Sequence, residues 1–512
     1  MIYLVGSGPG DPGLLTLKGL QVLQEADAVV YDRLAPESLL KYTKPGAELI
    51  YVGKKPGDDQ AMKQEEIEAL LVDLGRCGKT VVRLKGGDPY VFGRGGEEAL
   101  ALVEARLPFE VIPGVTSGIA APAYAGIPVT HRSVSTSVAF VTGHEDPTKG
   151  RSDVDWARVA KAADTLVLYM GMGRLREISA GLVSAGRSPG TPVAVIRWGT
   201  VPEQRTIAGT LEDIADKVEE ANLKPPAITV VGDVVALREA GLDWYERRPL
   251  FGRRVVVTRA RAQAGELSVE LEKLGAEVLE FPTIEVRPPD DLGPLDAAIR
   301  DLDSFDWLVF TSVNGVEAFV ERLERHGLDL RAVPRDAKVA TIGPATAQRV
   351  REAGLRVDVV PREFRAEALI GELAGDSLAG KKVLIPRALV AREILPEKLR
   401  EAGAEVAVPP AYESVPSSEG GDELARRLEA GEVDCVTFTA SSTVENFVGA
   451  FGEEEARRLL LGTRVACIGP ITADTARRRG IRVDVEAREY TIPGLVEAVV
   501  DLFAADPAKR GE

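Results

Sequence analysis

The chain of 512 residues is long enough for three or four domains, and its hydrophobic content of 45% with 28% charged residues is typical of a globular protein. Its net charge of −16 argues against broad binding to nucleic acid or to an anionic membrane surface. Three cysteines and three histidines, scattered along the chain, are too few for a disulfide framework or a Cys- or His-built metal site, so we expect no metal.

The setting we expect is cytoplasmic. No apolar run reaches the length of about 18 residues that a membrane span needs. The N-terminal residues MIYLVGSGPG pass directly into a strand and a glycine loop, which leaves no room for a signal peptide.

The first predicted strand, residues 2–5, ends in the loop GSGPGDPG. This loop resembles a dinucleotide-binding fingerprint, but the third glycine of G-x-G-x-x-G would fall on Asp11. Pro9 and Pro12 also prevent a helix from starting at the loop, so we expect it to begin near residues 14–16. A nicotinamide site is therefore disfavoured.

Three further strand ends carry charged side chains. Residues 28–31 lead to Asp32, residues 48–52 lead to Lys54, and the strand VVRL leads to the turn KGGDP with Asp88. Ligands of open α/β sheets bind at the carboxyl ends of the strands, so we expect these charges to meet at one rim. A purely structural turn with solvated, idle charges is the alternative.

Residues 109–231 predict a second α/β sheet, because short apolar strands alternate there with helical segments. Thr116 and Ser117 lie at the expected start of a helix of small residues, where backbone N–H groups and hydroxyls can bind a polar ligand. Met170 follows the strand TLVLY and is either a ligand contact or core filler.

The motifs of the first half resemble the tetrapyrrole methylases, in particular the uroporphyrinogen-III C-methyltransferases. They cover residues 1–240 in order: LVGSGPGDPGLLTLKG, VVYDRL, GKK, VVRLKGGDPYVFGRGGEE, VIPGVTSGIAAPAYAGIPVTHR, LVLYMGM and VIRWGT. The resemblance implies a two-domain methylase fold, with sub-domains at about 1–113 and 114–240, and a homodimer formed through this half.

The resemblance also implies S-adenosylmethionine as methyl donor, without a metal. It places the cofactor on Pro9, Gly86, Gly87, Asp88, Val91, Thr116, Ser117, Met170, Gly199 and Ala227. It makes Asp32 the proton acceptor and Lys54 the proton donor. The porphyrinogen substrate carries eight carboxylates, so basic side chains should line its cleft, and the candidates are Arg33, Lys54, Arg94, Arg132 and Arg197. Ordinary surface ion pairs are the alternative for each arginine.

A charged segment rich in turn residues, 241–252, predicts a linker in which Trp244 anchors the chain to a domain surface. An internal repeat follows it. VTRA at 257–260 and FTSVNG at 310–315 recur 128 residues later as IPRA and FTASST, and TIGPATA at 341–347 recurs 126 residues later as CIGPITA. The repeat predicts two similar α/β units with a cleft between them, which suits either an enzyme or a ligand-binding module.

The repeated loops, together with AYES, resemble uroporphyrinogen-III synthase over roughly residues 252–500. The resemblance implies a domain at 253–503 with two flavodoxin-like lobes, 253–284 plus 412–503 and 285–411, joined by a two-stranded crossover. Tyr412 matches the catalytic tyrosine of that family, and a packing tyrosine is the alternative. Weaker substrate contacts would be Arg259, Thr439, Ser441 and Ser442. The tail, 504–512, is expected to be disordered.

The two resemblances together predict an α/β protein and a bifunctional enzyme. The second half would cyclise hydroxymethylbilane to uroporphyrinogen III, and the first half would methylate that product at C2 and C7 to give precorrin-2. The alternative is a methylase of a related tetrapyrrole whose second half binds tetrapyrrole without catalysis. A methylase acting on a modified amino acid or RNA is a further rival, which the acidic charge disfavours.

Overall fold

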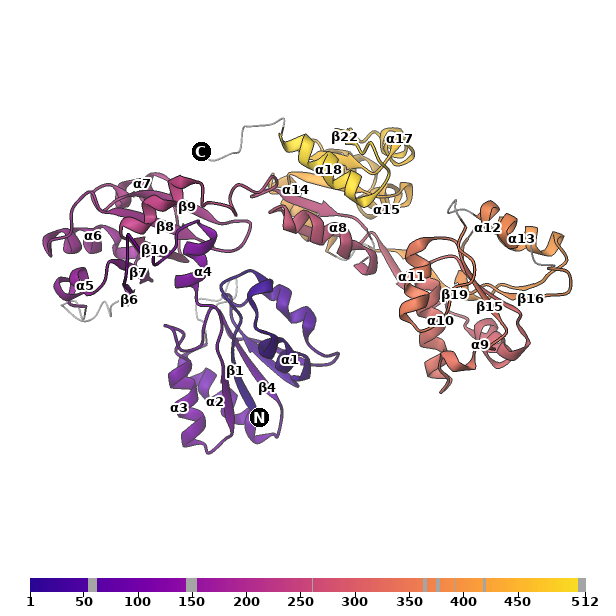
Figure 1. Ribbon diagram of the computed structural model, residues 1–512, viewed down its shortest axis with the longest axis horizontal. Helices are drawn as coiled ribbons and strands as arrows, with labels where there is room; N and C mark the ends of the chain where they lie inside the picture. Colours follow the sequence, from indigo (N-terminus) through magenta and orange to yellow (C-terminus); the bar gives the residue numbers. More distant parts are fainter. Residues whose placement is uncertain are drawn as a thin grey trace. The chain divides into compact units, whose positions relative to one another are not determined.

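The computed structural model describes residues 1–53, 62–143, 154–259, 261–361, 366–373, 378–391, 393–417 and 420–504 (Figure 1). The predicted Lys54 and most of the tail lie outside these residues. The chain forms two compact units, one built around Met1–Arg254 and the other around Val278–Leu502. Both units are α/β, as predicted. Among the described residues, no helix is both long enough and apolar enough to cross a membrane.

The first sheet is fully parallel, in the order β3-β2-β4-β1-β5. Its strands are β1 (Ile2–Gly6), β2 (Ala28–Tyr31), β3 (Glu48–Tyr51), β4 (Val81–Lys85) and β5 (Phe109–Ile112), and its helices are α1 (Leu17–Glu25), α2 (Gln64–Arg76) and α3 (Gly95–Glu104). Tyr31 pairs with Leu84, and Gly6 pairs with Lys85. The loops that follow β1, β2 and β4 therefore begin side by side at one edge of the sheet, as expected for parallel strands.

The second sheet is mixed, in the order β6-β7-β10-β8-β9, and only β6 and β7 pair in parallel among its strands. Its strands are β6 (Val138–Thr142), β7 (Thr165–Tyr169), β8 (Pro192–Arg197), β9 (Arg205–Thr210) and β10 (Ala227–Val231), and its helices are α4 (Ser117–Tyr124), α5 (Trp156–Ala162), α6 (Leu175–Ser184) and α7 (Ile214–Glu220). Two separate apolar clusters, one containing Ala121 of α4 and one containing Ile178 of α6, pack against alternate residues of the strands. The three central strands β7, β8 and β10 are consequently buried on both faces, whereas the edge strands β6 and β9 are partly exposed.

Trp244 anchors the segment after this sheet, as the sequence predicts. Its indole Nε1 donates a hydrogen bond of 3.1 Å to the carbonyl of Ala123, and its ring contacts Tyr124 edge-on at 5.0 Å. The ring of Tyr245 lies 4.8 Å from that of Tyr124 and 5.5 Å from that of Trp244, so the three rings form one cluster. The end of α4 is thus covered by aromatic rings of the linker.

The described residues of the second half form three sheets. One sheet has the order β12-β11-β20-β21-β22, with strands β11 (Arg254–Val257), β12 (Glu277–Glu280), β20 (Cys435–Phe438), β21 (Arg464–Cys467) and β22 (Val485–Glu486). A second has the order β15-β14-β16-β18, with strands β14 (Trp307–Phe310), β15 (Lys338–Thr341), β16 (Lys382–Leu384) and β18 (Glu405–Ala407). The third has the order β13-β19-β17, with strands β13 (Ile284–Arg287), β19 (Pro410–Pro416) and β17 (Arg387–Ala388). The helices are α8 (Arg261–Lys273), α9 (Gly293–Arg300), α10 (Val313–Arg325), α11 (Pro344–Glu352), α12 (Ala366–Leu373), α13 (Ile394–Glu401), α14 (Gly421–Glu429), α15 (Ser441–Phe451), α16 (Glu453–Leu459), α17 (Pro470–Arg478) and α18 (Ile492–Ala504).

The internal repeat is exchanged between the two larger sheets. β11, from the first copy, pairs with β20 of the second copy, and β16, from the second copy, pairs with β14 of the first. The equivalent third strands, β15 and β21, pair in parallel with β14 and β20. The antiparallel pair β13 and β19 carries the chain from one sheet to the other and back, which is the expected two-stranded crossover. This arrangement confirms two flavodoxin-like lobes.

Candidate active site

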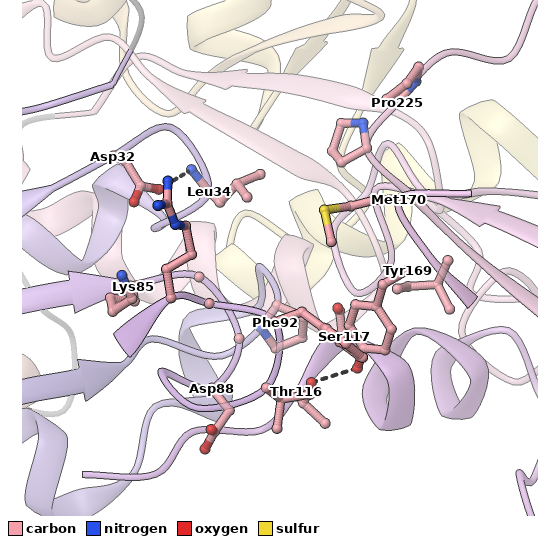
Figure 2. A pocket seen from close by; sticks show the side chains of 18 of the residues that line it. Asp32, Leu34, Lys85, Asp88, Phe92, Thr116, Ser117, Tyr169, Met170 and Pro225 are labelled. Atoms are coloured by element: carbon pink, nitrogen blue, oxygen red, sulfur yellow. Dashed lines mark hydrogen bonds between the residues drawn. The ribbon is translucent and has the colours of Figure 1, made fainter. Parts of the chain in front are cut away.

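A cavity of about 620 Å³ lies between the two sheets of the first unit, at the carboxyl ends of β2 and β4 (Figure 2). Asp32 and all ten residues predicted to hold the cofactor line it: Pro9, Gly86, Gly87, Asp88, Val91, Thr116, Ser117, Met170, Gly199 and Ala227. Figure 2 shows Asp32 on one side of the cavity and Met170 with Tyr169 on the other. The volume is in the range of small-ligand sites.

Three glycine loops meet under this cavity with almost no space between their backbones. Gly8 and Gly87 exchange backbone hydrogen bonds of 3.2 and 2.7 Å. A Cβ atom on Gly114 would lie 2.2 Å from the carbonyl oxygen of Gly87, and one on Gly6 would lie 2.5 Å from the nitrogen of Gly114. Only glycine therefore allows these loops to approach so closely.

Asp88 ties the loops together. One of its carboxylate oxygens accepts the N–H of Tyr90 at 2.8 Å, and the other accepts the N–H of Gly114 at 3.0 Å. The Gly-Gly-Asp-Pro turn thus has a clear structural function as well as a place in the cavity wall. A contact between Asp88 and the cofactor stays a prediction.

Strained backbone is concentrated at this cavity. Phe92, Arg94, Met170 and Trp198 all line it, and all adopt positive φ angles, between 46° and 59°. Such conformations cost free energy in residues other than glycine and cluster at functional sites. Met170 is also half exposed, with a relative accessibility of 52%, so it does not fill the core.

Tyr169 at the end of β7 holds the start of α4. Its hydroxyl lies 2.7 Å from the Thr116 hydroxyl and accepts the N–H of Gly118 at 2.7 Å. The first turn of a helix leaves N–H groups without partners in the helix, and here a tyrosine from the sheet satisfies one of them. Sequence reasoning missed Tyr169, although its position directly before Met170 could have indicated it.

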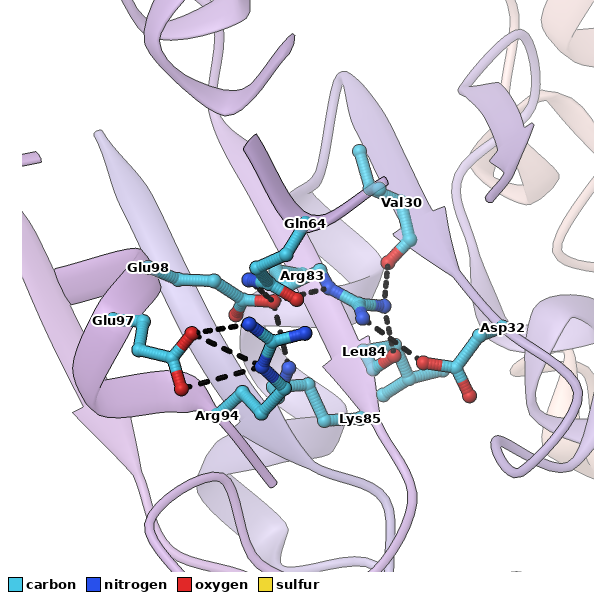
Figure 3. Close-up of polar contacts among 9 residues, drawn as sticks. All are labelled: Val30, Asp32, Gln64, Arg83, Leu84, Lys85, Arg94, Glu97 and Glu98. Atoms are coloured by element: carbon cyan, nitrogen blue, oxygen red, sulfur yellow. Dashed lines mark hydrogen bonds and ion pairs between the residues drawn. The ribbon is translucent and has the colours of Figure 1, made fainter. Parts of the chain in front are cut away.

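A buried charged network forms the wall around Asp32 (Figure 3). Arg83 of β4 donates from Nη2 to Asp32 at 2.9 Å and from Nε to Glu98 of α3 at 3.2 Å. Lys85 donates to the same Glu98 oxygen at 2.7 Å. Burial, followed by the neighbouring Arg83 guanidinium, lowers the pKa of Lys85. Sequence reasoning also missed these cations, although two charged residues inside the central strand VVRLK were a visible signal.

The predicted substrate arginines, Arg33, Arg132 and Arg197, are not among the described residues that line this cavity. Arg33 and Arg132 are exposed, and Arg197 donates to the carbonyl of Lys224 at 2.9 Å. Arg94 does line the cavity, and it also pairs with Glu97 at 2.6 Å. The roles of these arginines stay predictions.

Tyr412 lies in a separate, smaller site. It projects from β19 into an apolar cluster and is only 8% exposed, and its hydroxyl is 2.9 Å from that of Ser312, which caps α10. It also lines a cavity of about 230 Å³ together with Arg287, Arg322 and Arg325. Glu317 and Glu321 line the same cavity, and the three arginines pair with Glu413, Asp296 and Glu321. The structure therefore combines a packed tyrosine ring with a cavity that carries charges of both signs.

The weaker candidates of the second half do not lie in the Tyr412 cavity. Arg259 follows β11, and burial lowers the pKa of its guanidinium. Thr439 and Ser442 flank the start of α15, and the Ser441 hydroxyl donates to the carbonyl of Ile471 at 3.3 Å. Among the described residues, no group of His, Cys, Asp and Glu side chains in either half could hold a metal ion.

Comparison with known proteins identifies both halves. Residues 1–215 match the family model described as Tetrapyrrole (Corrin/Porphyrin) Methylases, and residues 265–497 match the one described as Uroporphyrinogen-III synthase HemD. The chain is 37% identical to the Porphyrin biosynthesis protein HemD of Ruminiclostridium josui, over 98% of each sequence.

Two further relatives match the first half. It is 54% identical to the S-adenosyl-L-methionine-dependent uroporphyrinogen III methyltransferase of Methanosarcina barkeri, a match over 46% of this chain and 93% of that protein. The crystal structure of uroporphyrin-III C-methyl transferase from Thermus thermophilus, complexed with S-adenyl homocysteine, is 43% identical with a TM-score of 0.40, over 46% of this chain and 99% of that one. The chain therefore belongs to the family that joins a tetrapyrrole methylase to a uroporphyrinogen-III synthase, and it is a bifunctional enzyme of tetrapyrrole biosynthesis.

Proposed function

We propose that the second half closes hydroxymethylbilane to uroporphyrinogen III, and that the first half methylates this product at C2 and C7 to give precorrin-2. The observation that carries the methylase part is the convergence of Asp32 and the ten predicted cofactor residues on one cavity. The proposal includes a homodimer through the first half and a cytoplasmic location, which rest on the resemblance and on the composition.

The cavity suits S-adenosylmethionine. Gly87 has a φ of +69°, and a Cβ atom placed there would meet nothing closer than 3.6 Å, so the backbone lies open to a ligand. The lining also combines hydroxyls, for ribose or amino-acid groups, with the apolar side chains of Val91, Met170 and Ile228 for an adenine ring. When bound, the cofactor supplies an electrophilic methyl group whose departure leaves a neutral thioether.

In this proposal, Asp32 accepts the proton that the ring must lose. Forming the new C–CH₃ bond breaks the S–CH₃ bond and leaves a cationic ring, which returns to neutrality when a proton leaves the ring. Each oxygen of Asp32 accepts one hydrogen bond, from the N–H of Leu34 at 3.0 Å and from Arg83 at 2.9 Å. Lone pairs therefore stay available toward the cavity.

Tyr412 donates the proton that converts the hydroxyl of the linear substrate into water. Its contact with Ser312 orients the phenol. The three arginines of the cavity each pair with a carboxylate of the protein, and a substrate rich in carboxylates would compete for them. Loss of that water allows ring closure, with inversion of ring D. Folding of the substrate by the protein supplies much of the acceleration.

The test is an anaerobic assay of the full chain with hydroxymethylbilane, with and without S-adenosylmethionine, followed by mass and isomer analysis. We expect the type III macrocycle without the donor and a product two methyl groups heavier with it. If only the type I macrocycle of spontaneous closure formed, the synthase proposal would be wrong, and the alternative of a methylase with a tetrapyrrole-binding second half would replace it.

Two variants in this assay control for each other. Asp32→Asn should slow methylation about 10²- to 10⁴-fold and leave cyclisation unchanged, whereas Tyr412→Phe should slow cyclisation and leave methylation of added uroporphyrinogen III unchanged. Both substitutions keep the shape of the side chain. Unaltered methylation by Asp32→Asn, or unaltered cyclisation by Tyr412→Phe, would remove the corresponding residue from the mechanism.

A further inference from the structure

The charged network behind Asp32 is buried far more deeply than a surface ion pair. The side chains of Arg83 and Glu98 are 4% and 0% exposed, and that of Lys85 is 5% exposed. The side chain of Asp32 is the most exposed of the four, at 27%. Two cations therefore face two anions (Figure 3). Asp32, Arg83 and Lys85 are among the described residues that line the cavity, whereas Glu98 is not.

Arg83 has its position fixed from several directions. Besides Asp32 and Glu98, it donates from Nη1 to the carbonyls of Leu84 at 3.1 Å and Val30 at 3.5 Å. One oxygen of Glu98 accepts hydrogen bonds from Arg83 and Lys85 and a longer one, of 3.5 Å, from Gln64. Its other oxygen is buried without a hydrogen-bond partner among the described residues. An incompletely paired buried carboxylate adds little stability, so the network is poorly explained by stability alone.

We propose that Arg83 is a positioning residue for methyl transfer, which holds the Asp32 carboxylate by a charge-assisted hydrogen bond and directs its free lone pairs into the cavity, and that Glu98 sets how strongly Arg83 does so. The proposal rests on the proton-acceptor role of Asp32 described above. A guanidinium fixed by three other acceptors cannot turn away from the carboxylate, so the orientation of Asp32 is set before substrate binds. Glu98 draws part of the same positive charge away from Asp32.

The charges that face Asp32 come from several elements. Arg83 and Lys85 belong to β4, and Glu98 lies behind them on α3. Arg94, at the start of α3, also lines the cavity, and Glu97 balances it. On its own loop, Asp32 has the exposed Arg33 beside it.

Substitutions at the two ends of the guanidinium should move the pH dependence of methylation in opposite directions. Arg83→Met removes the cation beside Asp32, so the carboxylate takes up its proton at a higher pH. The acidic limb of the pH profile should therefore move to higher pH by about one unit or more. Glu98→Gln removes the competing anion, so the acidic limb moves to lower pH. General damage to the fold cannot produce shifts of opposite sign.

The measurement is the pH profile of kcat/KM for methylation of uroporphyrinogen III by the full chain, with thermal unfolding measured on each variant. Arg187→Met is the matched control, because Arg187 donates only to carbonyls of residues 160–164 among its described hydrogen bonds and does not line the cavity. It should lower thermal stability and leave the acidic limb in place. Arg83→Lys should keep the limb near its native position while lowering the rate, since the charge stays but the fork geometry is lost.

Three outcomes decide the proposal. Shifts of the acidic limb in opposite directions in Arg83→Met and Glu98→Gln support it. If Arg83→Met does not fold, the proposal is supported by a shift to lower pH in Glu98→Gln together with an unchanged acidic limb in Arg83→Lys. Shifts in one direction, or none, in a chain whose methylation does depend on Asp32 would overturn it. If Asp32→Asn methylates normally, the proton-acceptor role fails first, and the role of Arg83 fails with it.

Discussion

Removing one hydroxyl, with Tyr169→Phe, should loosen the start of α4 at the cofactor cavity. The hydroxyl of Tyr169 accepts the N–H of Gly118 at 2.7 Å and lies 2.7 Å from that of Thr116, and all three residues are buried. Thr116 occupies the N-cap position of α4 but makes no capping hydrogen bond with its side chain. Phenylalanine fills the same volume, so the substitution removes the cap and little else.

The cost can be worked from these contacts. A buried N–H left without a partner costs about 1–3 kcal/mol, and a neutral hydrogen bond contributes about 1 kcal/mol, so the first turn should open more easily by about 2 kcal/mol. This free energy corresponds to about 30-fold faster exchange of the amide hydrogens there. Hydrogen exchange of the full chain, followed by mass spectrometry of peptides covering residues 117–120, would measure it. Because S-adenosylmethionine is proposed to bind this turn, its affinity should fall as well.

Tyr124→Phe is the matched control for this experiment. Tyr124 ends the same helix, and its hydroxyl donates to Asp11 at 2.7 Å, away from the first turn. It should leave exchange at Gly118 unchanged. Equal acceleration in both variants, or no acceleration in Tyr169→Phe, would refute the assignment of Tyr169 as the cap of α4.

Two further predictions concern the glycine loops and the thiols. Gly114→Ala should weaken cofactor binding tenfold or more, because its Cβ atom would lie 2.2 Å from the carbonyl of Gly87 and must push the loops apart; unchanged affinity by calorimetry would contradict this. Cys77 is exposed, whereas burial raises the pKa of the Cys435 thiol well above its usual range and that of Cys467 to about 12. At pH 8 to 9, iodoacetamide should therefore modify Cys77 in the native chain and leave the other two as unreactive thiols until denaturant is added, as mass mapping would show.

The local sequence determined which segments form elements and where their ends carry chemistry. VVRLK forms a strand because apolar and β-branched residues suit a buried position in a sheet, and the glycines after it allow the tight turn that follows. Parallel strands share one edge for their carboxyl ends, so Asp32 and Asp88 could be placed in one wall from the order of elements alone.

Tertiary structure decided which strands pair and which charges meet. The repeat at a spacing of 128 residues predicts two similar units, but the sheets exchange their first strands, β11 and β16, between the copies. Nothing local distinguishes the two pairings, because equivalent strands offer equivalent surfaces and the crossover pair β13 and β19 selects between them. The contacts of Arg83 with Glu98, and of Tyr169 with Gly118, join residues 15 and 51 positions apart. Such contacts form because packing buries polar groups, which must then be satisfied by hydrogen-bond partners. The periodicity of the sequence does not predict which partners these are.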